Sequence, residues 1–231
     1  MTPVIDVVLP ARNEAATVAA NVAAALSCSF VREVIVVDDG SVDDTGERAT
    51  AAGAKVLRRE DPRGTGSKAL AMAMGVAASD AGAILFVDAD CTGLTADHLD
   101  AICEPFVAGR ADMSIGAFDY GPFWNPQVRR WPPLSGERIV PRELFEAIPP
   151  EKLDGYTIEV RLNEVVAERR LRTVVRTMTG VSHRTKRDKL GRIEGIRQTW
   201  RMYKALIALP LTGDVRKRAY FLYLRGLTVE R

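Results

Sequence analysis

The sequence predicts an α/β protein in which helices flank a mixed, mostly parallel β-sheet. Three observations lead to this fold class. Short apolar or β-branched runs alternate with alanine-rich helical stretches through the first ninety residues. The connections between them are short, which implies parallel pairing through helical crossovers. Polar residues follow several of the strands, and because parallel sheets bind ligands beyond the carboxyl ends of their strands, we expect one crevice there.

Each element follows from a local pattern. Pro10 stops the first Val- and Ile-rich run, Asn13 and Glu14 open the first helix, and the run Asp43-Asp44-Thr45 can cap the second helix. A helical pattern also follows Val160. In chain order we expect a strand at 4–9, a helix at 15–26, a strand at 33–37, a helix from 45 toward 52, a strand at 54–58, a helix at 67–78, and strands at 83–87 and 172–176.

Composition limits the class of protein. The chain has 231 residues, 47% of them hydrophobic, which is enough for one substantial core. The amino terminus does not resemble a secretory signal, and no apolar run approaches the ~20 residues of a membrane span. Three cysteines without metal-ligand spacing favour free thiols over a disulfide framework or a zinc site. We therefore expect a cytoplasmic protein.

The net charge of +2 hides an asymmetry. Residues 161–231 carry an excess of 12 positive charges, and residues 1–160 carry an excess of 10 negative charges. A basic amphipathic helix is expected at 193–209, stopped by Pro210, and a second basic segment at 215–227. Packing onto the domain or onto a second copy in a homodimer is the favoured interpretation. The alternative is peripheral contact with the inner face of a membrane; a nucleic-acid partner is not expected.

Two aspartates, Asp88 and Asp90, stand at the end of the apolar run 83–87. Strand side chains alternate with a period of two, so both carboxylates can project to the same side. Such hard oxygen ligands suit Mg2+ or Mn2+ bound together with a diphosphate. Taken alone, such a pair is more often an ordinary polar cluster where a strand becomes a loop.

Two further motifs precede this pair. The three motifs in chain order are Val8-Leu9-Pro10-Ala11-Arg12-Asn13-Glu14, Val36-Val37-Asp38-Asp39-Gly40-Ser41-Val42-Asp43-Asp44-Thr45 and Asp88-Ala89-Asp90. In this order and spacing they resemble the nucleotide-sugar-binding half of GT-A fold glycosyltransferases of the family 2 type. Three ordered motifs are much more specific than any one of them. The resemblance implies a GT-A, Rossmann-like sheet and a UDP-sugar or GDP-sugar donor.

The resemblance also assigns residues to the donor site. It implies that the loop at 10–12 and Glu14 hold the nucleoside, that Asp39 accepts a hydrogen bond from the base, and that 88–90 contact ribose and metal. The chemistry agrees, because a carboxylate accepts from a base N–H and binds a cation that neutralises a departing diphosphate. The implied donor-binding residues of these motifs are Pro10, Ala11, Arg12, Glu14, Asp39, Asp88, Ala89 and Asp90.

A glycine-rich segment, 62–68, enters the helix at 67–78. It is not a Walker loop, because Gly66 does not directly precede Lys68 and Ala69 stands where Ser or Thr would bind the metal. Its backbone N–H groups and Lys68 can still meet a diphosphate. The segment resembles the corresponding stretch of glucosyl-3-phosphoglycerate synthase-like enzymes, which implies donor-binding roles for Gly66 and Lys68 and a catalytic role for Lys68.

The second half supplies the acceptor side. Residues 119–136 are rich in Gly, Pro and aromatic residues and predict a long loop over the substrates. Gly136 would allow close backbone approach to the donor. By resemblance, the Gly-Tyr-x-x-Glu pattern places Glu159 where inverting relatives carry a general base. The Glu-Asp pair of many family 2 members is absent, so the roles of base and of sugar ligand both stay open for Glu159.

His183 follows the strand expected at 172–176 and precedes a basic cluster. An isolated histidine in such a context is usually a surface or packing residue. Its position beyond Asp90 nevertheless resembles the histidine that completes the metal site in the same enzymes, and imidazole binds Mn2+ better than Mg2+. The metal ligands expected on this basis are Asp90 and His183, with Arg184 beside the diphosphate. His98 receives no role.

We therefore expect a GT-A catalytic domain over 1–190, with a nucleotide-sugar-binding half at 1–92 and an acceptor half at 93–190, and a basic helical tail over 191–231. The expected activity is metal-dependent transfer of a hexose from a nucleotide-diphosphate sugar to a small phosphorylated or lipid-phosphate acceptor. A sugar-phosphate nucleotidyltransferase is one alternative, but it should carry a glycine-rich loop and lysine directly after the first strand. A non-catalytic module that binds anionic surfaces is the other.

Overall fold

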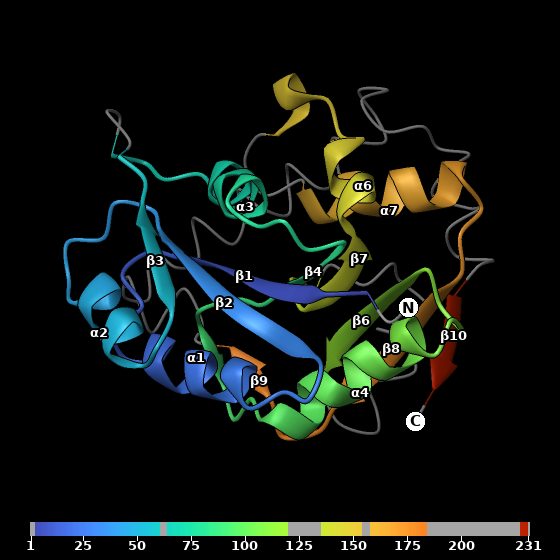
Figure 1. The fold of residues 1–231 in the computed structure, drawn as a ribbon, viewed down its shortest axis with the longest axis horizontal. Coiled ribbons are helices and arrows are strands. Elements are labelled where there is room, and N and C mark those ends of the chain that lie inside the picture. The colour runs from blue at the N-terminus through green and yellow to red at the C-terminus, as the bar shows by residue number, and fades with distance from the viewer. Residues whose placement is uncertain (1–2, 61–63, 120–134, 154–157, 184–226, 231) are drawn as a thin grey trace, which may run out of the picture.

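The computed structural model describes residues 3–60, 64–119, 135–153, 158–183 and 227–230. Its centre is an eight-stranded sheet in the order β10-β8-β6-β7-β4-β1-β2-β3 (Figure 1). The strands of this sheet are β1 (Ile5–Ala11), β2 (Val31–Asp38), β3 (Lys55–Arg58), β4 (Ala83–Phe86), β6 (Met113–Phe118), β7 (Arg138–Pro141), β8 (Thr173–Met178) and β10 (Leu227–Glu230).

A second, two-stranded sheet pairs β5 (Cys91–Thr92) with β9 (Ser182–His183). The helices are α1 (Val18–Leu26), α2 (Thr45–Ala51), α3 (Lys68–Ala77), α4 (Ala96–Val107), α6 (Arg142–Glu146) and α7 (Ile158–Glu168), with a 3-10 turn η1 (Pro150–Lys152).

The sheet is mixed and mostly parallel, as predicted. Strand β1 runs parallel to β2 and β4, β2 to β3, and β8 to both β6 and β10. Only β7 is antiparallel to its neighbours, β4 and β6. The crossovers that join parallel strands require helices, which explains the alternation seen in the first ninety residues. The carboxyl ends of β1, β2 and β4 therefore share one edge of the sheet.

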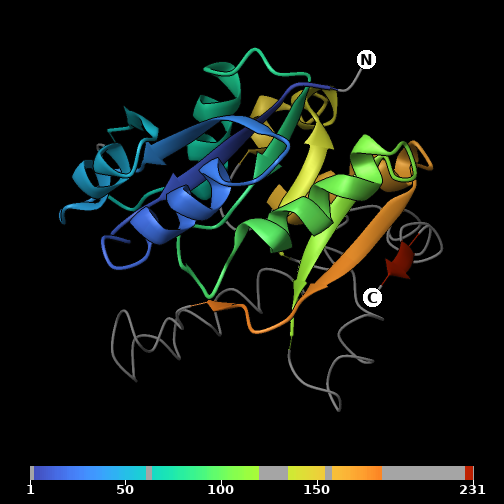
Figure 2. The same cartoon turned by 60° about the horizontal axis from the view of Figure 1, so that its bottom comes forward.

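Helices cover both faces of the sheet (Figures 1 and 2). Alternate residues of β1 divide between two cores: Val7 and Leu9 pack with residues of α1 and α4, and Val8 packs with residues of α3, α6 and α7. All three side chains are fully buried. Strands buried on both faces read as continuous apolar runs, which is why such runs located β1, β2 and β4 in the sequence.

The first strand runs further than expected. The sequence predicts a stop at Pro10, but β1 continues through Pro10 to Ala11, paired with β2 in register up to Asp38. Pairing of β1 with β4 ends at Val8, so beyond that residue the strand has a neighbour on one side only. A proline lacks only its own N–H, and a strand that has one neighbour tolerates that loss.

The tail differs at its end from the prediction. A helical tail is expected over 191–231, but residues 227–230 form β10, an edge strand parallel to β8. The helix expected at 193–209, the basic segment expected at 215–227 except for its last residue, Arg184, and most of the loop expected at 119–136 lie outside the described residues. The division of the chain at residue 190 stays a prediction.

The cysteines agree with expectation: Cys28, Cys91 and Cys103 are all buried and free. Within the described ranges, none of the helices is long and apolar enough to cross a membrane.

Candidate functional site

The first two motifs are hydrogen-bonded to each other at the carboxyl edge of the sheet. The backbone N–H of Asn13, which has φ +55°, donates to Ser41 Oγ at 3.0 Å, and the N–H of Val42 donates to Asn13 Oδ1 at 2.9 Å. The N–H of Glu14 donates to Thr45 Oγ1 at 2.8 Å. These bonds fix the loop after β1 on the turn that opens α2, and they hold the buried Glu14 of the first motif against Thr45 of the second.

Asp39 is buried at 4% exposure and lies against the glycine-rich segment. Its carboxylate accepts from the backbone N–H of Ser67 at 2.6 Å and from Arg59 Nε. Its own N–H donates to the carbonyl of Ala11 at 2.8 Å. Gly66 has φ +71°, and a Cβ there would lie 2.9 Å from Asp39 Oδ2 and in overlap with Arg12. The site thus requires glycine at position 66 for both conformation and space.

Two guanidinium nitrogens face this part of the site without a hydrogen-bond acceptor in the described part of the chain. They are Arg12 Nη1 and Arg59 Nη2, and both are buried. A buried donor without an acceptor costs roughly 1–3 kcal/mol, so such donors are usually satisfied by a ligand or water. The predicted nucleoside site therefore presents unused positive donors beside the Asp39 carboxylate.

The backbone of the loop at 88–90 accepts hydrogen bonds from two side chains at the start of α1. Thr17 Oγ1 donates to the carbonyl of Ala89 at 2.7 Å, and Asn21 Nδ2 donates to the same carbonyl at 2.9 Å. Asn21 also donates to the carbonyl of Cys91 at 3.1 Å. Both donor side chains are buried. These bonds fix the backbone on either side of Asp90, a constraint that the spacing of the motif does not reveal.

Lys68 joins three elements. Its Nζ lies 2.5 Å from Asp88 Oδ1, at the end of β4, and 2.7 Å from Glu159 Oε1, on α7. Burial opposes the charged ammonium, but the charges of Asp88 and Glu159 outweigh burial and raise the pKa of Lys68. The lysine therefore stays protonated at neutral pH, between two carboxylates that the sequence analysis assigned separately.

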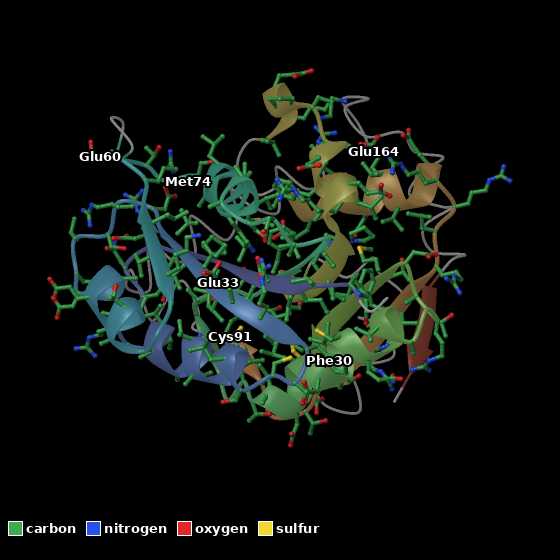
Figure 3. The ribbon with its side chains drawn as sticks, in the orientation of Figure 1. Phe30, Glu33, Glu60, Met74, Cys91 and Glu164 are labelled. Carbon is green, nitrogen blue, oxygen red and sulfur yellow. The ribbon has the colours of Figure 1, made fainter. Side chains whose placement is uncertain are left out.

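Gly136 and Glu137, which directly precede β7, complete this cluster. A Cβ on Gly136 would overlap the Asp88 carboxylate, so the backbone approaches that carboxylate as closely as glycine allows. Glu137 is fully buried and accepts from Cys91 Sγ at 3.0 Å and from Ser135 Oγ. Burial and the nearby charge of Asp88 raise the pKa of Glu137 to about 7. Cys91, labelled in Figure 3, lies among the α1 and α4 core residues, and burial raises its thiol pKa.

Arg138 was not assigned a role from the sequence, yet it is fully buried behind the cluster. Its Nε donates to the carbonyl of Ser135 at 3.0 Å, and its Nη1 donates to Asn163 Oδ1 at 2.9 Å. A weaker bond of 3.4 Å reaches the carbonyl of Glu159. A buried guanidinium with several acceptors joins β7 to α7 and so holds Glu159 in place. The only sequence signal for it is a charged pair directly before the apolar residues 139–140.

His183 lies beside the Asp88–Asp90 loop, because β9 pairs with β5 and places His183 opposite Cys91, the residue after Asp90. Its ring packs against Phe118 at the end of β6, with 5.1 Å between the ring centroids. The structure thus places the backbone of His183 opposite the residue that follows Asp90, although the two predicted metal ligands are 93 positions apart in the sequence. The described residues contain no cluster of three or more acidic, histidine or cysteine side chains that would enclose a cation.

The donor set at this point fits a cation that arrives with a diphosphate. One carboxylate and one imidazole leave most positions of an octahedral shell to phosphate oxygens and water, which is how Mg2+ and Mn2+ usually bind with nucleotides. A fully enclosed protein cage would not leave that room.

Comparison with known proteins identifies the family. Residues 6–156 match the family Glycosyl transferase family 2. The chain is 31% identical over 180 residues to glucosyl-3-phosphoglycerate synthase of Mycobacterium tuberculosis, an alignment that covers 73% of this chain and 55% of that protein. The same enzyme of Mycolicibacterium paratuberculosis is 31% identical over 194 residues, covering 68% of this chain and 58% of the relative. The chain therefore spans little more than half the length of these relatives.

Solved structures give the same result. The crystal structure of the Mycobacterium tuberculosis glucosyl-3-phosphoglycerate synthase in complex with Mn2+, UDP and glucosyl-3-phosphoglycerate superposes with a TM-score of 0.72 at 27% identity, covering 91% of this chain and 79% of that one. The complex of that enzyme with phosphoglyceric acid gives a TM-score of 0.72 at 26% identity, with the same coverage. From its fold, its motifs and these similarities, the chain belongs to glycosyl transferase family 2.

Proposed function

We propose that the chain is a metal-dependent glycosyltransferase that moves glucose from UDP-glucose to 3-phosphoglycerate or a closely similar phosphorylated acid. The observation that carries this proposal is the contact of Lys68 with both Asp88 and Glu159 beside the loop that holds Asp90. The relatives named above support the choice of substrates, because solved complexes of the Mycobacterium tuberculosis enzyme contain Mn2+, UDP-glucose and phosphoglyceric acid.

The nucleoside would lie at the edge formed by the first two motifs. Arg12 and Arg59 offer buried donors without acceptors in the described part of the chain, and the Asp39 carboxylate beside them would accept from the base. Gly66 would give the nucleoside room, because any side chain there would overlap Arg12. The buried Glu14 would complete the wall of this pocket.

Asp90 and His183 would hold Mg2+ or Mn2+ together with the diphosphate. Such a cation acts as a Lewis acid that neutralises negative charge on the departing diphosphate. Lys68 would add to that effect, because its raised pKa keeps the ammonium charged next to the same loop. Gly136 would leave room for the Asp88 carboxylate beside the backbone, because any side chain there would overlap it.

Glu159 would face the sugar and the acceptor. In the structure its Oε1 accepts from Lys68, and its backbone carbonyl accepts from Arg138. A carboxylate held in this way can accept a hydrogen bond from a hydroxyl of the sugar or of the acceptor, which orients that hydroxyl for attack. We assign to Glu159 the role of positioning both the Lys68 ammonium and a hydroxyl of the sugar or the acceptor.

Two other expectations receive less support. A nucleotidyltransferase would need a glycine-rich loop after the first strand, where β1 instead continues into Pro10 and Ala11 and the loop is tied to Ser41. Contact with a membrane or a lipid phosphate depends on the basic tail, most of which lies outside the described residues. A GDP-sugar donor remains a second candidate for comparison in the assay below.

The direct test is an assay of glucose transfer with UDP-glucose and 3-phosphoglycerate, with Mn2+, with Mg2+ and with EDTA. We expect metal-dependent formation of a glucosylated phosphoglycerate and release of UDP. GDP-glucose and glycerol 3-phosphate serve as the matched alternatives for donor and acceptor. Metal-dependent hydrolysis of UDP-glucose without transfer to any phosphorylated acid would reject the acceptor, and activity that is unaffected by EDTA would reject the metal.

Two substitutions separate the nucleoside from the metal part of the site. Asp90→Asn should weaken Mn2+-dependent binding of UDP-glucose and remove most transfer, because an amide does not offset the charge of the cation. Asp39→Ala should weaken UDP binding even without metal, because its proposed partner is the base. Calorimetry with UDP, with and without Mn2+, distinguishes the two variants, and unchanged affinity in either case would remove that residue from the site.

A further inference from the structure

We infer that His98 is a positioning residue that holds β9, and with it His183, against β5 beside Asp90. The inference rests on the proposed metal-binding role of His183 and adds a residue that the sequence analysis left without a role. His98 is on the first turn of α4, outside the cluster around Lys68.

The hydrogen bonds of His98 define which ring nitrogen carries the proton. Nδ1 accepts from the backbone N–H of Thr95 at 3.3 Å and lies 2.9 Å from Thr95 Oγ1, which completes a capping box at the start of α4. Because Nδ1 is an acceptor, a neutral ring carries its proton on Nε2. Nε2 then donates to the carbonyl of Thr179 at 3.1 Å. One imidazole therefore connects the cap of α4 to the turn after β8.

That turn leads directly into β9. Gly180 has φ +80°, and its carbonyl lies against Gly93, where an added Cβ would be only 2.7 Å away. Beyond it, Ser182 and His183 pair with Thr92 and Cys91. The loop before α4 and the turn before β9 thus pack backbone to backbone. His98, on α4, connects that helix to the turn through its hydrogen bond to the Thr179 carbonyl.

The two-stranded sheet needs such an anchor. Each strand has only two residues, and Ser182 and His183 are exposed. Isolated two-stranded ribbons are marginal in water. Thr92 Oγ1 donates to the Ser182 carbonyl at 3.1 Å or bonds to Ser182 Oγ at 2.8 Å, and Phe118 contacts the His183 ring from β6. Loss of the bond to Thr179 would let the turn move, and a metal ligand that must first be ordered binds its cation more weakly.

Substitutions at positions 98 and 95 separate the bond to Thr179 from the helix cap. In His98→Asn the side-chain oxygen occupies the place of Nδ1, so the contact with Thr95 remains while the bond to Thr179 is lost. In His98→Gln the terminal amide nitrogen reaches the place of Nε2 and can donate to Thr179, and Gln is also a usual residue at this position of a capping box. Thr95→Ala removes the capping hydroxyl, while Nε2 of His98 can still donate to Thr179. A residue that acts only as a helix cap would make Thr95→Ala the defective variant and leave His98→Asn normal.

The first readout needs no metal. Amide hydrogen exchange across residues 179–183 should become faster in His98→Asn than in the wild type, and should stay close to the wild type in His98→Gln. The second readout is the dissociation constant of Mn2+ in the presence of saturating UDP, measured from the EPR signal of free Mn2+. We expect His98→Asn to raise it about tenfold, His98→Gln to leave it nearly unchanged, and His183→Ala to raise it at least as much as His98→Asn.

The outcomes are distinct. Equal exchange rates and equal Mn2+ affinity in the wild type and His98→Asn would overturn the inference, as would a defect confined to Thr95→Ala. Normal Mn2+ affinity in His183→Ala would overturn it as well, because there would be no ligand to position. A wild-type protein that binds UDP but no Mn2+ would contradict the proposed function, while the exchange rates would still decide whether His98 holds β9.

Discussion

At the scale of single residues, the site consists of close contacts among buried polar groups, and at Gly136 there is no room even for a methyl group. Gly136 lies against the Asp88 carboxylate, and the neighbouring Glu137 is fully buried with its two oxygens bonded to Cys91 and Ser135. Lys68 is the described cation closest to both carboxylates of the cluster. These side chains hold one another in place, so a substitution at one of them should change the position and the binding contribution of its neighbours.

Gly136→Ala should displace the Asp88 carboxylate and break its ion pair with Lys68, because a Cβ at position 136 overlaps all three carboxylate atoms. We expect UDP-glucose affinity to fall by about tenfold and stability by roughly 1–3 kcal/mol, as for other overpacked sites. Calorimetry and urea denaturation measure the two effects. Gly82→Ala is the control, since nothing lies within 4 Å of a Cβ there. Normal donor affinity in Gly136→Ala would show that the Asp88 position is unimportant.

Glu137 should make stability depend on pH. Its pKa in the folded protein is raised to about 7 from an ordinary 4.5, because burial disfavours the charge. A group with a raised folded pKa contributes stability that is complete below its unfolded pKa and is lost as pH rises through the folded one. Between pH 4.5 and 7 the wild type should lose roughly 3 kcal/mol through this group.

The matched variant is Glu137→Gln, which keeps the shape and removes the titration. Urea denaturation at pH 5 and pH 8 should show a smaller loss of unfolding free energy in this variant than in the wild type, and the exposed Glu151→Gln should behave as the wild type does. An identical pH dependence in wild type and Glu137→Gln would mean that another group titrates in this range.

At the scale of secondary-structure elements, helices set the positions of the loops more than the strands do. The start of α1 holds the loop at 88–90 through Thr17 and Asn21, α3 and α7 meet through Lys68 and Glu159, and α4 reaches the turn before β9 through His98. The parallel strands only bring their carboxyl ends to one edge. The orientation of the proposed site therefore depends on a few side chains from the helices that cover both faces.

Thr17→Val tests the role of α1 in this arrangement. It is nearly isosteric but removes the donor to the Ala89 carbonyl, a bond of 2.7 Å in a buried setting. We expect a loss of roughly 1–3 kcal/mol in stability and a weaker Mn2+ affinity in the presence of UDP, since the backbone before Asp90 is freed. Thr17→Ser keeps the hydroxyl and should retain the affinity. Comparable losses in both variants would trace the effect to packing rather than to the hydrogen bond.

At the scale of the whole molecule, the donor side and the far edge of the sheet are separated. The site lies at the carboxyl ends of β1, β2 and β4, whereas β10 is an edge strand, separated from β4 by β8, β6 and β7. The edge strand β10 covers Thr173 to Arg176 of β8. Stability and substrate binding should therefore respond differently to changes at the β10 edge.

Removal of residues 227–231 should lower stability without changing UDP affinity. The truncation exposes the backbone groups of β8 along a new edge, which costs stability and favours association between copies. We expect roughly 1–2 kcal/mol of lost stability, a Tm lower by about 2–8 °C, and larger species in light scattering. A truncated protein with wild-type Tm would show that β10 contributes little to stability. A large loss of UDP affinity would show that β10 also affects the donor site.

Local sequence determined the elements and the family of this protein. The alternation of apolar runs and helical stretches predicted the strands and helices of the first ninety residues, because buried parallel strands and their crossover helices each have a local pattern. The three ordered motifs predicted the nucleotide-sugar fold, and the comparison with known proteins confirmed family 2. The positions of Asp39, Asp88 and Asp90 at strand ends also followed from local pattern, since parallel strands end at one edge.

Only the tertiary structure decided which distant residues meet and what their surroundings are. The contact of Lys68 with Glu159, 91 residues away, the burial of Glu137 and Arg138, and the bond from His98 to Thr179 have no local signature. The antiparallel β7 and the edge strand β10 were likewise not predictable from their short runs. The physical reason is that burial, pKa and long-range hydrogen bonds depend on how elements pack against each other. A sequence pattern shows only which face of a single helix or strand is apolar.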